Sequence, residues 1–216
     1  MRPFFQREFR ELGHVPRWQI ARTIKKQNVA AHSFYVCLYT HRTMEMLAWP
    51  ENCPNRLRAI EWAIYHDVPE AGVGDVQSPT KRRMGNGSLK ALEHEYVRTR
   101  FGEGTPVKPR SSAAAAVVNF ADKLEQAMFL AEELQLGNKT LGESLLTPAK
   151  GRDTICSMVM RHLKLAWDDV KNFNKSHETS DYQWRTYVIA SIIENFDSMS
   201  YIIQDMPGDK PTVRSL

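Results

Sequence analysis

Proline- and glycine-containing breaks divide this chain into segments whose apolar residues recur at helical spacing, and no segment alternates like a β-strand. This pattern restricts the chain to an all-α fold, a compact bundle of about six or seven helices. Six helices can be placed, at residues 29–47, 54–67, 89–101, 111–136, 153–173 and 182–204. The glycine-rich segment 70–87 is expected to be a loop with a short turn.

Local signals mark the ends and faces of the first two helices. Asn28 is a suitable N-cap for the first helix, and Pro50 lies beyond its end. In the second helix, Leu57, Ile60 and Ile64 fall at helical spacing and predict a buried stripe. Ser111 is the expected cap of the long helix that follows.

Length and composition limit the possible classes of protein. The chain has 216 residues, which predicts one domain over 1–216. Hydrophobic residues make up 42% and charged residues 25%, which excludes a wholly disordered chain. No apolar stretch approaches the length of a membrane span, and the N-terminus lacks a secretory signal, so a cytoplasmic protein is expected. Three widely spaced cysteines, without a CxxC pair, argue against a disulfide framework or a zinc ribbon.

Four residues predict a metal site. His66 and Asp67 are adjacent at the end of a helix, and a nitrogen ligand beside an oxygen ligand suits a divalent transition metal. Alone, the dipeptide is more typical of a surface pair. His32 and Asp122, however, lie in apolar helical segments, where an acid is costly unless it is paired or binds a cation. His32, His66, Asp67 and Asp122 together leave room on an octahedral ion for water and substrate.

The order and context of these ligands resemble the HD-domain metal-dependent phosphohydrolase superfamily, whose pattern is H…HD…D. The string RWQIARTIKKQNVAAHSFYV is similar to the N-terminal motif of the bacterial 5′-deoxynucleotidase branch. HDVPEAGVGDVQSPTK resembles the HDxxE…GD…(S/T)PxK loop of that branch, and FADKLEQA resembles its closing Asp helix. The resemblance covers residues 15–135 and implies a single HD domain, in which helices within 151–205 complete the bundle.

The resemblance also implies roles around the metal. Glu70 matches the acid that positions or deprotonates the attacking water, and Asp75 matches a loop acid assigned to catalysis or to the sugar hydroxyl. Arg17 and Lys81 match cations that face phosphate. Elementary chemistry agrees, because a phosphorus centre needs positive charge around its oxygens and a carboxylate near water can act as a general base.

Two further residues match substrate-facing positions. Trp18 matches the residue that packs against sugar and base and helps to exclude ribonucleotides. With Ile20, it is similar to the purine-pocket pair of phage dATP triphosphohydrolases. Apart from the resemblance, these site residues have ordinary explanations: Trp18 as core, Lys81 as part of a solvated KRR run, and Asp75 as a turn residue.

These assignments predict hydrolysis of the 5′ phosphoester of a deoxynucleotide with one divalent ion per site. Two histidine ligands favour Zn²⁺, Co²⁺, Mn²⁺, Ni²⁺ or Fe²⁺ over Mg²⁺. The favoured substrate is a dNTP, dATP first, which would yield deoxynucleoside and triphosphate. Extra cations suit a longer phosphate chain, although they are also typical of solvated surface: Lys25, Lys26, Lys81, Arg82 and Arg83. The alternative is a dNMP 5′-nucleotidase that releases orthophosphate.

A nucleic-acid-binding or regulatory helical module with a vestigial site is a third possibility. The formal net charge of +4 permits it, but no RNA- or DNA-binding motif is present. All four ligand positions and Glu70 are intact, which favours an enzyme. The resemblance further implies a homo-oligomer, a dimer or a hexamer, in the host cytoplasm if the protein is phage-encoded.

Overall fold

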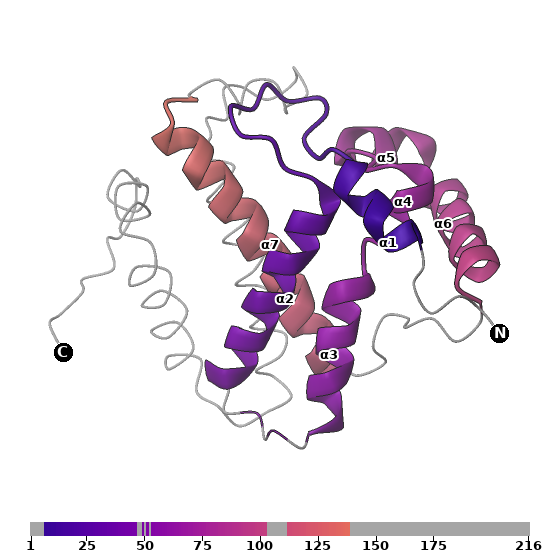
Figure 1. Cartoon of the computed structure of the whole chain (residues 1–216), viewed down its shortest axis with the longest axis vertical. Helices are drawn as coiled ribbons and strands as arrows, with labels where there is room; N and C mark the ends of the chain where they lie inside the picture. Colours follow the sequence, from indigo (N-terminus) through magenta and orange to yellow (C-terminus); the bar gives the residue numbers. More distant parts are fainter. Residues whose placement is uncertain (1–6, 47–48, 50, 52, 103–111, 139–216) are drawn as a thin grey trace, which may run out of the picture.

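The computed structural model describes residues 7–46, 49, 51, 53–102 and 112–138 (Figure 1). Its helices are α1 (Arg7–Glu11), the 3-10 helix η1 (Leu12–His14), α2 (Val29–Met46), α3 (Pro54–Tyr65), α4 (Glu70–Val73), α5 (Ser78–Met84), α6 (Asn86–Arg100) and α7 (Ser112–Gln135). Within those ranges there is no strand, only an isolated antiparallel bridge between Pro16 and Asn28. The predicted all-α class is confirmed, whereas Ser111 and the expected helices at 153–173 and 182–204 lie outside the described residues.

Three helices, α2, α3 and α7, pack against one another in the middle of the molecule (Figure 1). Their shared core is made of Val36, Met44, Ala59, Ala63, Ala114, Val117, Val118 and Ala121. Half of these residues are alanines, and small side chains at a helix crossing let the backbones approach closely. This packing sets the backbone positions from which the metal-binding candidates project.

A second group of helices, α4, α5 and α6, lies to one side of the central three (Figure 1). The helix α6 contacts both α4 and α5, and a small core of Leu12, Val29 and Val68 joins η1 to the start of α2. Gly72 allows α4 to approach α6, because a Cβ at this position would lie 2.2 Å from the ring of Tyr96.

The expectation of a loop over residues 70–87 is wrong, since this segment contains two short helices. The first, α4, ends at Gly74, and the second, α5, has a proline in its first turn and ends at Gly85. Both glycines have positive φ angles, 75° and 77°, which glycine adopts at low cost. The glycines therefore end helices here and do not prevent them.

The predicted stripe on the second helix is wrong at two of its three residues, since only Ile60 packs against the shared core. Leu57 is 63% exposed and Ile64 is 45% exposed, whereas Ala59 and Ala63 are buried. The helix α3 contacts α2 and α7, and Ala59 and Ala63 are its fully buried residues in the shared core, with Ile60 and Trp62 packed beside them. The N-cap prediction is confirmed, since the side-chain oxygen of Asn28 accepts a 2.8 Å hydrogen bond from the N–H of Ala31.

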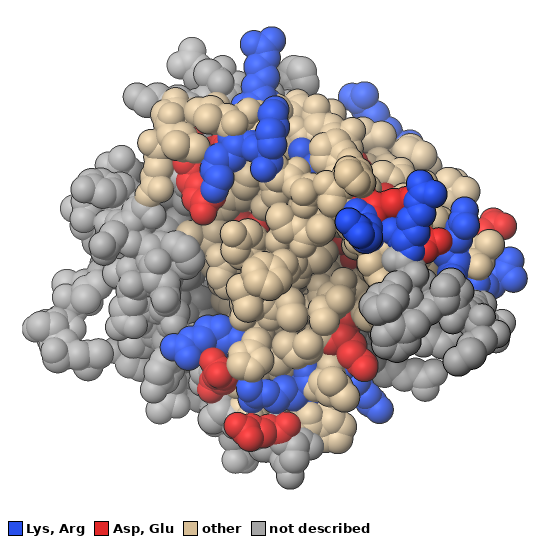
Figure 2. Space-filling model, viewed as in Figure 1, with Lys and Arg blue, Asp and Glu red and all other residues tan. Residues whose placement is uncertain are grey.

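Residues 17–27 form a loop, called here the N-terminal loop, between η1 and α2. The Arg17 N–H donates to the Gln27 carbonyl at 2.9 Å, and the Val29 N–H donates to the Val15 carbonyl at 3.0 Å, so the two ends of the loop are held together. Figure 2 shows Lys and Arg side chains in groups around the rim of one face, several of them with Asp or Glu side chains beside them. None of the described helices combines the length and the apolar character needed to span a bilayer.

Candidate metal centre

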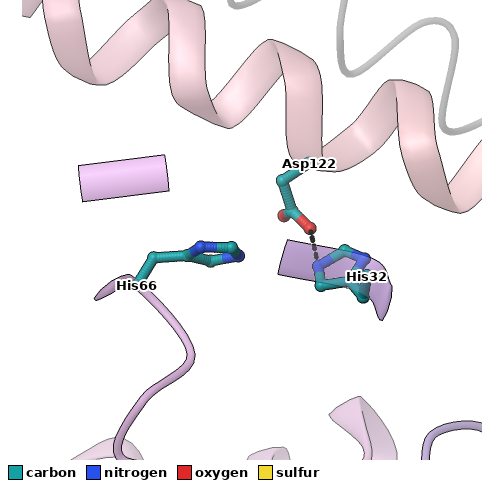
Figure 3. Close-up of side chains that lie close together, drawn as sticks. All are labelled: His32, His66 and Asp122. Atoms are coloured by element: carbon teal, nitrogen blue, oxygen red, sulfur yellow. Dashed lines mark ion pairs between the residues drawn. The ribbon is translucent and has the colours of Figure 1, made fainter. Parts of the chain in front are cut away.

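The central helices bring three predicted ligands to one point. His32 lies in the first turns of α2, His66 directly follows α3, and Asp122 lies in α7. Their ligand atoms lie within 4.8 Å of one another, and His32 Nε2 is 3.3 Å from Asp122 Oδ1. In Figure 3, the ring of His66 points toward the His32–Asp122 pair.

Asp67, the fourth predicted ligand, lies at the edge of this cluster. Its Oδ2 atom is 3.4 Å from His32 Nε2 and 3.3 Å from His66 Nε2. The other ring nitrogen of His66, Nδ1, lies 2.8 Å from the carbonyl oxygen of Ala63. A carbonyl can only accept, so Nδ1 carries the hydrogen and Nε2 presents its lone pair to the cluster.

The donor set fits a divalent cation. The Nε2 atoms of His32 and His66 are both buried and have no hydrogen-bond partner among the described residues. A buried polar atom without a partner costs about 1–3 kcal/mol, so an arrangement that aims two of them at one point calls for a ligand. Two imidazole nitrogens with carboxylate oxygens are a common set for divalent transition metals.

The charges around the cluster favour a cation as well. Burial lowers the pKa of His32, as does the Arg17 charge, but contacts with Asp122 and Glu125 outweigh both and raise it to about 9. Burial raises the pKa of Asp122, yet His32 and Lys123 hold it well below its usual range. The carboxylates therefore stabilise positive charge beside the two Nε2 atoms, which a proton or a metal ion can supply.

Glu70, the predicted acid for the attacking water, is buried at the start of α4. It lies near Lys81 and Arg17, the two cations predicted to face phosphate. Burial, with the nearby carboxylates of Asp67 and Asp75, raises the pKa of Glu70 to about 9, whereas Lys81 and Arg17 lower it. Lys81 Nζ lies 3.6 Å from Glu70 Oε1, and Arg17 Nη1 lies 3.8 Å from Asp67 Oδ2. The structure thus brings these two acids and two cations together beside the predicted ligands.

Asp75 lies where the N-terminal loop meets the segment after α4. Its carbonyl oxygen accepts a 3.4 Å hydrogen bond from the side chain of Gln19, and its carboxylate accepts one of 2.6 Å from Gln77. Burial raises the pKa of Asp75, while Arg17 and Lys81 lower it. Asp75 therefore shares the electrostatic surroundings of Glu70.

Trp18 is buried and packs against the protein itself. Its indole stacks on the ring of Phe129, with centroids 5.1 Å apart and planes 9° apart, and its Nε1 donates to Gln27 Oε1 at 3.0 Å. Ile20, on the same loop, is 46% exposed. Contact of either residue with a nucleotide stays a prediction.

Sequence reasoning did not identify three site residues on α7: Glu125, Phe129 and Glu133. They follow the predicted ligand Asp122 at intervals of three and four residues and so share one face of the helix with it. This face contacts His32, Gln27, Trp18 and the backbone of the N-terminal loop. Lys123 and Gln126 both bind the carboxylate of Asp122, each at 2.9 Å. The sequence signal that could have identified them is the recurrence of acidic residues on one face of an otherwise apolar helix.

Comparison with known families agrees with this geometry. Residues 4–102 match the family described as 5′-deoxynucleotidase YfbR-like. This segment, a little under half of the chain, is therefore similar to the YfbR-like HD-domain family. The match includes His32, His66 and Asp67 and ends before Asp122. The resemblance seen in the sequence is therefore confirmed.

Individual relatives carry two different names. A dATP triphosphohydrolase of Acinetobacter phage SH-Ab 15497 is 33% identical over 130 residues, which cover 55% of this chain and 62% of the relative. A 5′-deoxynucleotidase of Erwinia tasmaniensis is 26% identical over 144 residues, covering 57% of this chain and 70% of the relative. The match thus spans less than two thirds of the phage relative's length.

The fold also has a counterpart among solved structures. A conserved hypothetical protein from Pyrococcus furiosus superposes with a TM-score of 0.59 at 21% identity. The superposition covers 87% of this chain and 96% of that protein. It supports the helical fold and carries no information on activity.

Proposed function

We propose that this protein is a metal-dependent phosphohydrolase that cleaves the 5′ phosphoester of a deoxynucleotide. The observation that carries the proposal is the convergence of His32, His66, Asp67 and Asp122, in which the two buried histidine Nε2 atoms have no hydrogen-bond partner and face carboxylate oxygens. A dNTP, with dATP first, is the proposed substrate, supported by the name of the phage relative. The products would be a deoxynucleoside and triphosphate.

The four residues of the cluster would hold one divalent ion, Zn²⁺, Co²⁺, Mn²⁺, Ni²⁺ or Fe²⁺ in preference to Mg²⁺. Such an ion supplies Lewis-acid charge that activates water and offsets the charge of phosphate oxygens. Arg17 and Lys81 add positive charge beside the same cluster, where the carboxylate oxygens of Asp67 and Glu70 orient them. This charge stabilises the additional negative charge of the transition state.

In the proposed reaction, the oxygen of water bonds to the α-phosphorus while the bond from phosphorus to the 5′ oxygen breaks. The 5′ oxygen takes a proton from solvent as it leaves, which regenerates the deoxynucleoside hydroxyl, and the proton removed from the attacking water returns to solvent. Glu70 is the proposed general base for water. Burial raises the pKa of Glu70, but the positive charges of Lys81, Arg17 and a bound cation would lower it and so favour the ionised carboxylate that a base requires. Asp75 is proposed to act beside it or to bind the sugar hydroxyl, and Trp18 with Ile20 to face sugar and base.

A dNMP 5′-nucleotidase is the second candidate. The description of the matching family and the name of the Erwinia relative favour it. The chemistry at phosphorus is the same, but the product is orthophosphate. A non-catalytic helical module is a third outcome that the following experiment separates from both.

Product analysis tests the proposal. The purified protein is incubated with Co²⁺, Mn²⁺ or Zn²⁺ and with separate pools of dNMPs, dNTPs and rNTPs, and the phosphorus products are resolved. Triphosphate with deoxyadenosine, lost in Asp67→Ala, supports the dATP triphosphohydrolase. Orthophosphate from dNMPs alone supports the 5′-nucleotidase instead. Wild-type protein as inactive as Asp67→Ala in every pool contradicts both enzymes.

Domain organisation and assembly are proposals as well. We infer a single HD domain over residues 1–216 that forms a homo-oligomer, a dimer or a hexamer. Light scattering coupled to gel filtration tests the assembly, and a monomer at micromolar concentration contradicts it. Limited proteolysis tests the domain, since a stable fragment that ends near residue 138 would indicate two units.

A further inference from the structure

One buried carboxylate lies between the metal centre and the N-terminal loop. Glu125 is on α7, one turn after Asp122, and is 3% exposed. Its Oε2 atom contacts Nδ1 of His32. Its Oε1 atom accepts a 2.5 Å hydrogen bond from the side-chain amide of Gln27. The two oxygens of one side chain therefore serve two different parts of the site.

The contact with His32 determines which ring nitrogen faces the metal ligands. A carboxylate only accepts hydrogen bonds, so Nδ1 of His32 carries a hydrogen, and Nε2 is the nitrogen that offers its lone pair when a metal ion takes the place of a proton there. That Nε2 atom lies 3.3 Å from Asp122 Oδ1 and 3.4 Å from Asp67 Oδ2. A carboxylate in this position holds the ring and increases the basicity of the ligating nitrogen.

The contact with Gln27 has an equivalent effect on Trp18. Because the amide nitrogen of Gln27 donates to Glu125, its oxygen is left to accept from the indole Nε1 of Trp18. Trp18 has a φ of 59°, a left-handed conformation that costs a residue with a side chain about 1–2 kcal/mol. Its contacts must therefore impose this conformation: Phe129 holds the face of the indole and Gln27 holds its edge.

We propose that Glu125 and Gln27 are positioning residues. The Glu125 carboxylate orients His32 directly and Trp18 through Gln27, whereas Gln27 orients only Trp18. The substrate readout rests on the proposed function, whereas the metal readout does not. His32 Nδ1 and the Gln27 amide both donate to the carboxylate of Glu125. A glutamine at position 125 has only one acceptor oxygen, and its NH2 group would face the other donor, so at least one contact is lost.

Metal affinity tests the first half of the proposal. Metal-free protein is titrated with Zn²⁺ or Co²⁺ in competition with a chromogenic chelator. We expect Glu125→Gln to lower the affinity about 10–100-fold. Glu132→Gln removes the same charge from an exposed position on the same helix and should stay within about twofold of wild type. Unchanged affinity in Glu125→Gln overturns the role of Glu125 at His32.

Substrate kinetics and fluorescence test the second half. Gln27→Met keeps the length of the side chain but removes both hydrogen bonds. We expect metal affinity to stay at the wild-type value and KM for the deoxynucleotide to rise about tenfold, with a much smaller change in kcat. The emission of Trp18, obtained as the difference between each protein and its Trp18→Phe counterpart, should also change. Wild-type KM and wild-type Trp18 emission in Gln27→Met overturn the role of Gln27.

The two proposals fail in distinguishable ways. If no deoxynucleotide is hydrolysed but Glu125→Gln weakens metal binding and Gln27→Met alters Trp18 emission, the proposed function falls and the positioning roles stand. If the wild type hydrolyses deoxynucleotides and both variants equal it in every readout, the positioning roles fall and the function stands. Circular dichroism establishes that each variant is folded. Should Glu125→Gln not fold, Gln27→Met decides the role at Trp18, and Glu125→Asp, which keeps the charge but shortens the side chain, decides the role at His32 by the same loss of metal affinity.

Discussion

The metal centre and the N-terminal loop are positioned by different kinds of interaction. The proposed ligands project from α2, from the end of α3 and from α7, whose backbones are set by an alanine-rich core. The loop instead depends on side chains at the end of α7. The buried Glu133 accepts hydrogen bonds from the N–H groups of Ile24 at 2.8 Å and Lys25 at 2.7 Å. Asn138 donates to Glu133 at 2.6 Å and to the Arg22 carbonyl at 2.7 Å.

This difference shows how one site can combine a rigid part with a part that single residues control. Apolar helix packing is shared among many side chains, so the backbone under the ligands does not depend on one contact. Besides the stacking of Trp18 on Phe129, the loop is held to α7 by hydrogen bonds, and one carboxylate satisfies two of its backbone donors. Loss of that carboxylate leaves both part-buried donors without this acceptor, which costs more than the bonds themselves contribute.

The largest effect should follow from a change at the metal end. Asp122→Asn removes a charged ligand without changing the size of the side chain. We expect metal binding to weaken sharply and turnover to fall about a thousandfold, since a catalytic cation supplies several kcal/mol to the transition state. The thermal midpoint should change little, because the alanine core is untouched. Wild-type turnover in this variant contradicts the ligand assignment.

The next largest effect should appear in the loop. Glu133→Ala removes the acceptor for Ile24 and Lys25 and leaves Asn138 without this partner. We expect the free energy of unfolding to fall by about 2–4 kcal/mol, as measured by urea denaturation. Metal affinity should stay near the wild-type value, because Glu133 does not contact the ligand cluster. A metal affinity that falls as much as in Asp122→Asn contradicts the separation of the two regions.

A third test concerns α4, which carries Glu70 and belongs to neither region. Gly72→Ala forces a Cβ against the ring of Tyr96, so we expect a loss of about 1–3 kcal/mol in unfolding free energy. Gly87→Ala is the matched control: nothing lies within 4 Å of its Cβ position, and alanine is favoured in a helix by up to about 1 kcal/mol. Equal effects of the two substitutions contradict close packing of α4 on α6.

The smallest effect should come from the neighbour of Glu133. Glu132 pairs with the side chain of Lys25 at the surface, where about half of each side chain is exposed. Glu132→Ala should change the unfolding free energy by at most about 0.5 kcal/mol, and less at high salt. A loss as large as that of Glu133→Ala shows that the ion pair, and not the buried carboxylate, holds the loop.

Local signals predicted a large part of this protein. Helical periodicity indicated the all-α class, and Asn28 marked the start of α2, because capping depends only on residues a few positions apart. His32, His66, Asp67 and Asp122 stood out as polar residues in apolar segments or as an adjacent ligand pair, and the structure brings them together. The spacing of apolar residues gave a wrong prediction for Leu57 and Ile64, which are exposed, whereas Ala59 and Ala63 are the buried residues of that helix.

The partners of the buried acids on α7 required the tertiary structure. Glu125 contacts His32 across 93 positions of the chain, and Glu133 binds the N–H of Ile24 across 109. The spacing of acids along a helix indicates that they share a face, but only the packing of α7 against α2 decides what that face meets. The left-handed backbone of Trp18 has the same origin, because no local preference of tryptophan favours it and the contacts with Phe129 and Gln27 impose it.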